Sequence, residues 1–426
     1  MKRKGTQGPG AEATASARPV NGHGNGPARA WWIRPVERPT INEKTAEFGR
    51  FSGANIFEIY ARLKTERDGD GAVEAEQTSR ARRLAAWMRE KKPGYCLPDH
   101  QLSEGAWTLM RSARPGEGLL SWTCLAVRTP DQMGVLCHTA SREEMANTVK
   151  AAARFYGAGL AGIAPMNESY VDLRQEQRDI VIEDVDKPSV SAQRFVIPRR
   201  MKWVVAMAIP MDLEFLSRAP TALGDAATGL GYSHSLFVVA SLAEFIRGLG
   251  YEAIPSVNDT AQSVPFAIDA GLGELSRLNK LVTPEFGAGI RLCKVFTDLP
   301  MACDKPIDFG LSEHCRTCRV CANACPAHAL SFDEEPSFNV RGPWNNPGHK
   351  AWFEDSYRCF QYWQKVDNGC GICVASCPYT KAARASSRKQ AASGASMSER
   401  FFRIKDLALE STAKPDPERW RVGSGR

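Results

Sequence analysis

The sequence lacks several features that would assign it to a common class of protein. It has no apolar run near 18 residues, so no membrane-spanning helix is predicted. Its basic N-terminus is not followed by an apolar segment, which excludes a recognisable signal peptide. It has only seven histidines, and those at His138, His234, His314 and His328 show no metal-ligand spacing.

The folded part of the chain also lacks positive charge. Residues 1–40 carry +5 and residues 379–426 carry +6, which leaves −4 for residues 41–378 out of the total of +7. The basic residues therefore belong to the two ends of the chain. A nucleic-acid-binding protein needs a cationic surface, so we do not expect a nucleic acid as partner.

The apolar pattern predicts a mixed α/β core over about 140–300. Residues 142–157 are expected to form a helix, Trp203–Met211 a buried strand and Ser233–Gly248 a second helix, with a further strand at Lys294–Thr297. Gly-rich residues 157–162 resemble a dinucleotide-binding loop. A strand must precede such a loop, and here a helix is expected instead, so we exclude nucleotide binding there.

Eight cysteines lie in two closely spaced runs. Two triple-cysteine runs that each end in Cys-Pro are typical of a protein with two 4Fe–4S clusters, in which the last cysteine of each run binds the other cluster. This rule predicts one cluster held by Cys315, Cys318, Cys321 and Cys377, and a second held by Cys325, Cys359, Cys370 and Cys373. A pair of zinc sites is the alternative, because Cys-x2-Cys pairs also suit zinc. The spacing favours clusters, and so one-electron transfer.

The other five cysteines are scattered along the chain. We expect them to be buried thiols without a ligand role, at Cys96, Cys124, Cys137, Cys293 and Cys303.

A ferredoxin needs far fewer residues than this chain has, so the upstream residues predict a second cofactor or a catalytic centre. Over about 140–380 the chain resembles the reductive dehalogenases, corrinoid iron–sulfur enzymes that remove halogens from organohalides. The resemblance rests on both cysteine runs and on long motifs: Gly-Leu-Gly-Tyr-Ser at 229–233, Phe-Ile-Arg-Gly-Leu-Gly-Tyr-Glu-Ala-Ile-Pro-Ser-Val-Asn at 245–258, 264–274, 283–287, 294–300 and 304–310. Trp31-Trp32 followed by Arg38-Pro39-Thr40 also resembles the start of mature family members.

The resemblance implies an α/β (α+β) fold, with a nitroreductase-like corrinoid-binding core and a C-terminal bacterial-ferredoxin-like domain for two 4Fe–4S clusters. It also implies a base-off cobalamin, and the sequence contains no Asp-x-His-x-x-Gly, the motif expected if a histidine replaced the lower base. Composition predicts a disordered tail over 1–30 and a basic low-complexity tail over 382–426. Between them, the resemblance implies an N-terminal region contributing to the pocket over 31–140, the cobalamin-binding core over 141–300 and the two-cluster domain over 301–381.

The family's proton donor is a tyrosine, and it corresponds to Tyr232. A phenol is a weak acid near neutral pH, and an adjacent cation helps it to give up its proton. Arg291 corresponds to that cation, and Asn258 to a polar pocket residue that orients substrate or proton. Trp363, beside the second cysteine run, lines the substrate pocket or simply packs, and the sequence does not decide between the two.

The chain departs from respiratory family members in carrying no twin-arginine export signal, so we expect a cytoplasmic protein, unless a mis-called start codon conceals that signal. It ends before any reductase module, so we expect an external electron donor: a ferredoxin, a flavodoxin or a reductase. A membrane-anchor partner is not favoured. Two alternatives stay open: an epoxyqueuosine-reductase-like enzyme acting on tRNA, and a non-catalytic iron–sulfur electron carrier.

Overall fold

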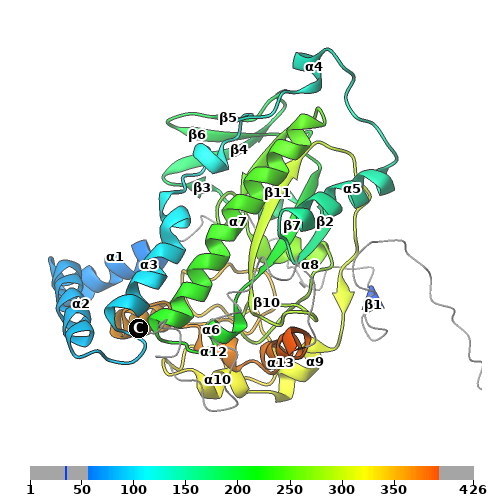
Figure 1. Cartoon of the computed structure of the whole chain (residues 1–426). Helices are drawn as coiled ribbons and strands as arrows, with labels where there is room; N and C mark the ends of the chain where they lie inside the picture. Colours follow the sequence, from blue (N-terminus) through cyan, green and yellow to red (C-terminus); the bar gives the residue numbers. More distant parts are fainter. Residues whose placement is uncertain (1–33, 36–55, 393–426) are drawn as a thin grey trace, which may run out of the picture.

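The computed structural model describes residues 34–35 and 56–392. The predictions for residues 1–30, for Trp31-Trp32, for Arg38-Pro39-Thr40 and for residues 393–426 lie outside the described residues. The described part of the chain is a central sheet covered by helices, with the cysteine-bearing helices gathered at one end (Figure 1).

The central sheet has four strands in the order β2-β7-β11-β8, and every neighbouring pair is antiparallel. The strands are β2 (Leu160–Pro165), β7 (Trp203–Pro210), β11 (Ile290–Thr297) and β8 (Ala253–Ser256). The strand predicted at Trp203–Met211 is confirmed as β7. The strand predicted at Lys294–Thr297 is the second half of β11, which begins at Ile290 and so includes Arg291.

Both faces of this sheet are buried. Side chains alternate along a strand, so Val204 and Val205 of β7 belong to different cores. Val204 packs with Phe266 of α8 (Ser263–Asp269). Val205 packs with residues of α5 (Arg142–Phe155) and α7 (Ala222–Gly248). Figure 1 shows α5 and α7 on one face and α8 on the other. Burial on both sides explains why β7 is a continuous apolar run.

Helix α5 begins where the sequence predicted it. Its N-cap Ser141 accepts a hydrogen bond from the Glu144 backbone N–H (3.2 Å), and the Glu144 carboxylate accepts one from the Ser141 N–H (3.0 Å). This reciprocal pair satisfies two N–H groups that the first helical turn leaves unpaired. A helix, as expected, therefore precedes the glycine-rich residues 157–162, and β2 begins within them.

Helix α7 is longer than predicted, since it begins at Ala222 rather than at Ser233. The prediction was wrong because residues 222–232 are rich in glycine, which weakens a helix that tertiary contacts here stabilise. Within the described residues α7 is the one helix long and apolar enough to cross a membrane by length and composition. However, 67% of its most apolar 18-residue window is buried inside the fold, so we interpret α7 as the core helix.

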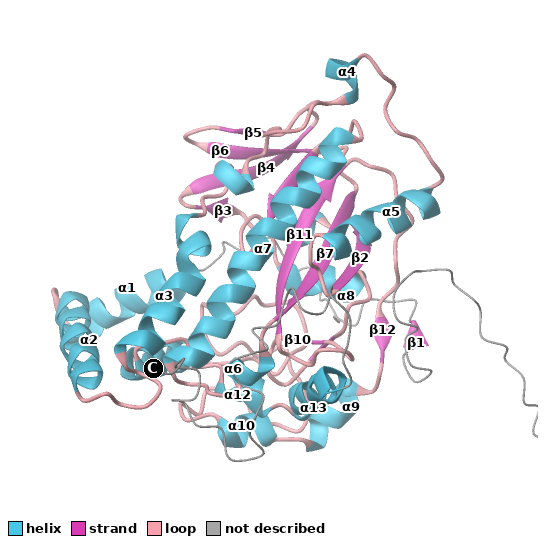
Figure 2. Cartoon of the chain, in the orientation of Figure 1, coloured by secondary structure: helices cyan, strands magenta, loops and turns pink. Residues whose placement is uncertain are grey.

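The remaining strands form three small sheets, drawn in magenta in Figure 2. One has the order β3-β4-β6-β5: β3 (Arg174–Gln175), β4 (Arg178–Glu183), β6 (Arg194–Pro198) and β5 (Ser189–Val190). The other two are the hairpin of β9 (Glu274–Leu275) with β10 (Leu281–Val282), and the pair β1 (Arg34–Pro35) with β12 (Ile307–Asp308).

Two groups of helices complete the fold. The first group comprises α1 (Ile56–Asp68), α2 (Ala72–Arg89), α3 (Leu97–Ser112), α4 (Pro130–Met133) and α6 (Leu213–Leu216). The second group lies at the cysteine end: α9 (Leu311–Thr317), α10 (Val320–Ala324), α11 (Ser356–Val366), α12 (Ile372–Ser376) and α13 (Pro378–Ala392). Residues 382–392, predicted as the start of a low-complexity tail, belong to α13. Its alanines favour a helix, and composition alone concealed this.

Helix α2 is tied to the cysteine end by charge. Arg80 Nε lies 2.8 Å from Asp367 Oδ1, and Arg83 Nε lies 3.0 Å from Asp367 Oδ2. The Asp367 side chain is only 2% exposed, and Arg83 also donates to the Gln364 carbonyl (2.7 Å). A buried carboxylate shared by two guanidinium groups fixes α2 against the end of α11.

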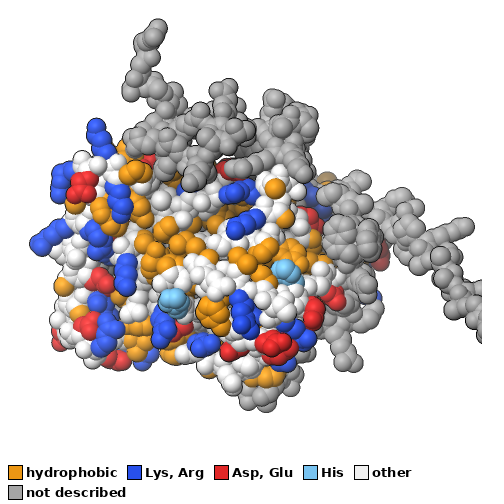
Figure 3. All heavy atoms as spheres, turned by 90° about the horizontal axis from the view of Figure 1, so that it is seen from below, with side chains coloured by type: hydrophobic (Ala, Val, Ile, Leu, Met, Phe, Trp, Pro, Cys, Tyr) orange, Lys and Arg blue, Asp and Glu red, His pale blue; other side chains and the backbone are white. Residues whose placement is uncertain are grey.

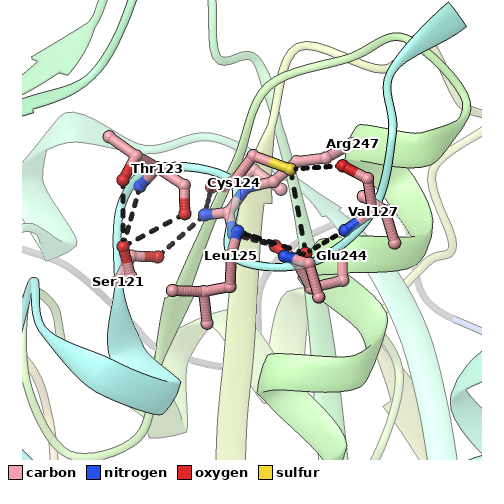
Figure 4. Close-up of polar contacts among 9 residues, drawn as sticks. Ser121, Thr123, Cys124, Leu125, Val127, Glu244 and Arg247 are labelled. Carbon is pink, nitrogen blue, oxygen red and sulfur yellow. Dashed lines mark hydrogen bonds and ion pairs between the residues drawn. The ribbon is translucent and has the colours of Figure 1, made fainter. Parts of the chain in front are cut away.

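Glu244 of α7 fastens the loop that follows α3 (Figure 4). Its carboxylate accepts hydrogen bonds from the backbone N–H groups of Leu125 (3.1 Å), Ala126 (2.8 Å) and Val127 (3.1 Å), and from Arg247 Nη1 (2.6 Å). Burial alone would raise the pKa of Glu244. The donors from Ala126, Val127, Arg247 and Leu125 outweigh burial and lower the pKa to about 2.

We predict that Glu244→Gln lowers the free energy of unfolding by about 1–3 kcal/mol near neutral pH, because the N–H groups that donate to the carboxylate lose their charged acceptor. A carboxyl group whose pKa falls on folding stabilises the protein above its unfolded pKa, and this contribution disappears as the pH falls through the folded value. The difference from wild type should therefore be complete at neutral pH and shrink below about pH 4.5. Urea unfolding followed by circular dichroism over this pH range measures it.

Glu117→Gln is the matched control, because Glu117 is exposed. An equal loss of stability in the control, or a Glu244 effect that grows in acid, would contradict the prediction.

Candidate functional site

Tyr232 lies in the middle of α7, at a point where two glycines allow other side chains to come close. A Cβ atom on Gly229 would lie 2.6 Å from Cδ1 of Trp107, and one on Gly231 would lie 3.0 Å from Cγ of Arg291. A glycine inside a helix costs about 1 kcal/mol relative to alanine. The Gly-Leu-Gly-Tyr motif therefore accepts a weaker helix in exchange for close packing around the tyrosine.

The structure brings Tyr232, Asn258 and Arg291 together from three different elements. Asn258 follows β8 and donates from Nδ2 to the Tyr232 hydroxyl oxygen at 2.8 Å. Arg291 of β11 donates from Nη1 to the same oxygen at 3.4 Å, and its Cζ lies 4.7 Å from the centre of the tyrosine ring. Arg291 Nη2 also donates to Thr228 Oγ1 (3.3 Å), one turn before Tyr232. The phenol oxygen thus has two nitrogen donors directed at it.

These donors change the acidity of the phenol. Burial raises the pKa of Tyr232, but the charge of Arg291 and the hydrogen bonds from Asn258 and Arg291 outweigh burial and lower the pKa below its ordinary value. Lys280 lowers the pKa further through its charge. Both donors stabilise the phenolate more than the phenol, so the site favours loss of the hydroxyl proton.

A buried lysine holds the loop that carries Asn258. Lys294 of β11 is fully buried and donates from Nζ to the carbonyl oxygens of Val257 and Asp259 (both 3.1 Å) and to Ser263 Oγ (3.0 Å). The Asp259 carboxylate accepts from the Val257 N–H (2.7 Å). The residues on both sides of Asn258 are therefore fixed, which directs its side chain at Tyr232.

Trp107 of α3 is a site residue that the sequence did not predict. Its ring centre lies 5.4 Å from that of Tyr232, and its Nε1 donates to Asp225 Oδ2 (2.8 Å). The buried Asp225 also accepts from Ser103 Oγ (2.7 Å) and from the Gly369 N–H (3.0 Å). A single tryptophan in an amphipathic helix gives no sequence signal of this kind, because its partner lies more than a hundred residues away.

The first predicted set of cysteines lines one cavity. The thiols of Cys315, Cys318, Cys321 and Cys377 line a small pocket together with Arg277, Leu278, His314 and Tyr379. Burial first, and then the thiols of Cys315 and Cys377, raise the pKa of Cys321 to about 12. Burial also raises the pKa of Cys315 to about 11, although a hydrogen bond from the Arg277 backbone lowers it. Thiols bind iron as thiolates, so iron must displace these protons. Cys377 of the second run thus lines the same pocket as three cysteines of the first run, and the assignment of these four to one cluster stays a prediction.

The thiols of the second predicted set act on one another through their charge, so these cysteines lie near one another. Burial and then Glu354, opposed by Lys280 but reinforced by the thiols of Cys370 and Cys325, raise the pKa of Cys359 to about 12. Burial and the thiols of Cys359 and Cys370 likewise raise the pKa of Cys373. Within the described residues no three His, Cys, Asp or Glu side chains are close enough to share one metal ion. In a 4Fe–4S cluster the four cysteines surround a cubane rather than a single ion.

We expected all five remaining cysteines to be buried, and this prediction is wrong for three of them. Cys96 and Cys293 are buried, but Cys124, Cys137 and Cys303 are exposed. The apolar neighbours of Cys124 and Cys137 in the sequence misled the prediction, because Leu125 and Leu136 are themselves exposed. Apolar composition in a loop does not imply burial.

Trp363 lies on α11 and packs against Phe360, with ring centres 5.6 Å apart. Its buried Nε1 has no hydrogen-bond acceptor among the described residues, and the same holds for Arg291 Nε and for Gln262 Nε2, which lies just after the Asn258 loop. Buried donors are normally satisfied. Each of these three donors could therefore serve an acceptor of a bound group.

Two family models match the chain. Residues 175–301 match the reductive dehalogenase subunit, and residues 314–380 match the 4Fe–4S double cluster binding domain. The first range contains Tyr232, Asn258 and Arg291, and the second contains all eight clustered cysteines.

Known proteins agree with these models. The tetrachloroethene reductive dehalogenase of Sulfurospirillum multivorans is 40% identical over 327 residues, which cover 69% of this chain and 64% of that protein. Two solved structures share the fold. The catabolic reductive dehalogenase NpRdhA in complex with 3-bromo-4-hydroxybenzoic acid has a TM-score of 0.60 and 23% identity, covering 82% of this chain and 44% of that one. A reductive dehalogenase described with a mechanism for B12-dependent dehalogenation has a TM-score of 0.59 and 24% identity, covering 83% and 46%.

The chain thus spans about two thirds or less of the length of the relatives it matches. Its two family-model matches, its 40% identity to a curated member and its fold agree with one another, and the chain belongs to the reductive dehalogenase family.

Proposed function

We propose that this chain is the catalytic subunit of a reductive dehalogenase that replaces a halogen of a small organohalide by hydrogen. The observation that carries the proposal is the contact of the Tyr232 hydroxyl with Asn258 at 2.8 Å and with Arg291 at 3.4 Å. Removing halide from carbon in this way consumes electrons and a proton. The eight cysteines supply the route for electrons, and the contact at Tyr232 supplies the proton.

The residues that hold the cofactors are also part of the proposal. We assign Cys315, Cys318, Cys321 and Cys377 to one 4Fe–4S cluster, and Cys325, Cys359, Cys370 and Cys373 to the other. The unpaired donors of Arg291, Gln262 and Trp363 are candidates to bind the amide oxygens of a cobalamin. When bound, a cobalamin would supply the reducing chemistry needed to cleave a carbon–halogen bond.

The protein residues then complete the reaction. Tyr232 gives its hydroxyl proton to the carbon from which halide has left. Arg291 and Asn258 stabilise the phenolate that remains, through an opposite charge and a hydrogen bond. Lys294 fixes the Asn258 loop, and Trp107 packs beside the phenol ring, so both limit the movement of the donor group.

We predict that Tyr232→Phe lowers the rate of halide release at least about 100-fold, the usual loss when a general acid is removed. The protein, reconstituted anaerobically with cobalamin, iron and sulfide, is assayed with reduced viologen as electron source on a panel of aryl and alkyl halides. The variant should bind cobalamin and both clusters as the wild type does, since only the hydroxyl is lost.

Tyr251→Phe is the control, because the Tyr251 hydroxyl donates to the His138 carbonyl (3.0 Å) far from this site. Activity that survived in Tyr232→Phe would show that the proton comes from elsewhere. A wild-type protein that bound its cofactors without releasing halide would instead favour a non-catalytic electron carrier.

The lowered pKa of Tyr232 predicts a pH dependence. The proton donor works in its protonated form, so activity should fall as the pH rises through the pKa of Tyr232. Arg291→Gln removes a charge that lowers this pKa, so the alkaline fall in activity should move to higher pH while the maximal rate drops. The pH profile of halide release with reduced viologen measures both effects. Arg174→Gln, on an exposed strand, serves as control, and an alkaline limb that stayed in place would contradict the assignment of Arg291.

The crossed cysteine sets predict which variants share a phenotype. Cys377→Ser should disturb the same cluster as Cys318→Ser, although Cys377 is closer in the sequence to Cys373. Cys373→Ser should disturb the other cluster. Electron paramagnetic resonance of the reduced proteins, together with iron analysis, distinguishes the two. Cys303→Ser, at an exposed cysteine outside both sets, should leave both clusters intact. Grouping of Cys377→Ser with Cys373→Ser would reverse the ligand assignment.

We also propose that an external protein supplies the electrons at the face formed by the cysteine-bearing helices. Around the first cysteine set, His314, Arg319 and Lys381 are exposed, and so is Val320 at 39%. Figure 3 views the molecule from this side and shows Lys and Arg side chains spread between exposed hydrophobic ones. Such a surface suits a small acidic electron carrier of the ferredoxin or flavodoxin class.

A further inference from the structure

Arg277 is a fully buried cation at the cysteine end of the molecule. It lies in the turn between β9 and β10, and it is 0% exposed. Its side chain lines the same cavity as the thiols of the first cysteine set. Neither the sequence motifs nor the proposed reaction gives this residue a role.

The guanidinium of Arg277 is satisfied entirely by backbone carbonyls. Nε donates to the carbonyls of Cys315 and Cys318, both at 3.0 Å. Nη2 donates to Cys315 (2.6 Å) and Arg316 (3.2 Å), and Nη1 donates to Ser331 (2.9 Å) and Asp333 (2.6 Å). The ring of the buried Trp352 lies 4.9 Å from Cζ.

These contacts satisfy the hydrogen bonds of Arg277 but leave its charge unbalanced. No carboxylate of the described residues forms an ion pair with it, and every acceptor is a neutral carbonyl. A buried charge without a counter-charge is strongly unfavourable. Arg80 and Arg83, by comparison, share the carboxylate of Asp367. An anionic group bound in the pocket would supply the counter-charge that Arg277 lacks.

A thiolate-bound 4Fe–4S cluster provides that charge, since four thiolates outweigh the positive charge of the iron–sulfur core. We propose that Arg277 is a positioning residue for the first cluster: its buried guanidinium balances the negative charge of the cluster and raises the potential at which the cluster accepts an electron. The inference rests on the two-cluster assignment of the proposed function.

The direction of the effect follows from charge. Reduction adds one electron to the cluster and breaks no bond, so the reduced cluster is the more negative state. A nearby cation stabilises it more than the oxidised state, and burial prevents water and salt from screening the interaction. Arg319 lies in the same cysteine run but is exposed, so its charge is screened and should affect the potential much less.

A purely structural role for Arg277 makes a different prediction. The carbonyls of Cys315 and Arg316 belong to the last turn of α9, where carbonyls lack partners within the helix. Arg277 caps that turn, and this role depends on the fork of donors rather than on charge. Lysine keeps the charge and loses the fork, whereas glutamine loses the charge, so the two variants separate the roles.

The test uses the full chain, reconstituted anaerobically with iron and sulfide. Arg277→Lys, Arg277→Gln and the control Arg319→Gln are titrated with a chemical reductant, and the reduction of each cluster is followed by electron paramagnetic resonance. Arg277→Gln should shift the potential of one cluster, the one disturbed by Cys318→Ser, to a more negative value. Arg277→Lys should keep most of the wild-type potential, and Arg319→Gln should leave both potentials in place.

Two results would overturn the proposal: an unchanged potential in Arg277→Gln, or equal shifts in Arg277→Gln and Arg277→Lys. If Arg277→Gln retains iron for one cluster alone, its potential cannot be compared, and the test then depends on Arg277→Lys. It must bind both clusters at a potential close to that of the wild type, and its failure to do so would assign Arg277 to the folding of the loop. A wild-type protein without two clusters would count against the proposed function instead.

Discussion

The close approach of side chains to helix α7 is the constraint on which the rest of the structure depends. Gly229 leaves room for the Trp107 ring, and Gly231 leaves room for the side chain of Arg291. Trp107 and Arg291 therefore both contact Tyr232. The same helix carries Asp225 near its start and Glu244 near its end. Asp225 binds α3 and the loop after α11, and Glu244 binds the loop at 125–127. One helix therefore sets the position of the tyrosine, the N-terminal helices and part of the cysteine end at once.

The segment from Glu274 to Lys280 connects the sheet core to the cysteine end. Glu274 accepts from the N–H groups of Phe309 and Leu311 at the start of α9, and burial raises its pKa to about 7 despite these donors. Arg277 holds the carbonyls at the end of α9. Lys280 forms an ion pair with Glu354 at 2.8 Å and acts through its charge on both Cys373 and Tyr232. Charges on a single hairpin thus bear on the first cysteine set, the second set and the proposed proton donor.

Lys294 and Arg277 show a common way of using a buried cation. Each is fully buried and donates to backbone carbonyls of a functional loop, the Asn258 loop for Lys294 and the first cysteine run for Arg277. Such contacts fix a loop through its backbone, without a carboxylate side chain as acceptor. They differ in charge balance: Lys294 lies near Asp259 and Asp172, which favour its charged form, whereas the groups that favour the charge of Arg277 are the thiols of the first set.

The sequence by itself determined the features that depend on local spacing. These include the two cysteine runs, the buried strand at Trp203–Pro210, the helix at Arg142–Phe155 and, through family motifs, the three residues Tyr232, Asn258 and Arg291. Only the tertiary structure decided the rest: that α7 begins at Ala222, that Cys124, Cys137 and Cys303 are exposed, and that Trp107 contacts Tyr232, Lys294 contacts the Asn258 loop and Arg277 contacts the first cysteine run. The physical reason is the range of the interactions. Periodicity and ligand spacing act over a few residues, whereas close packing at a glycine and the balance of a buried charge depend on partners that the fold brings from far along the chain.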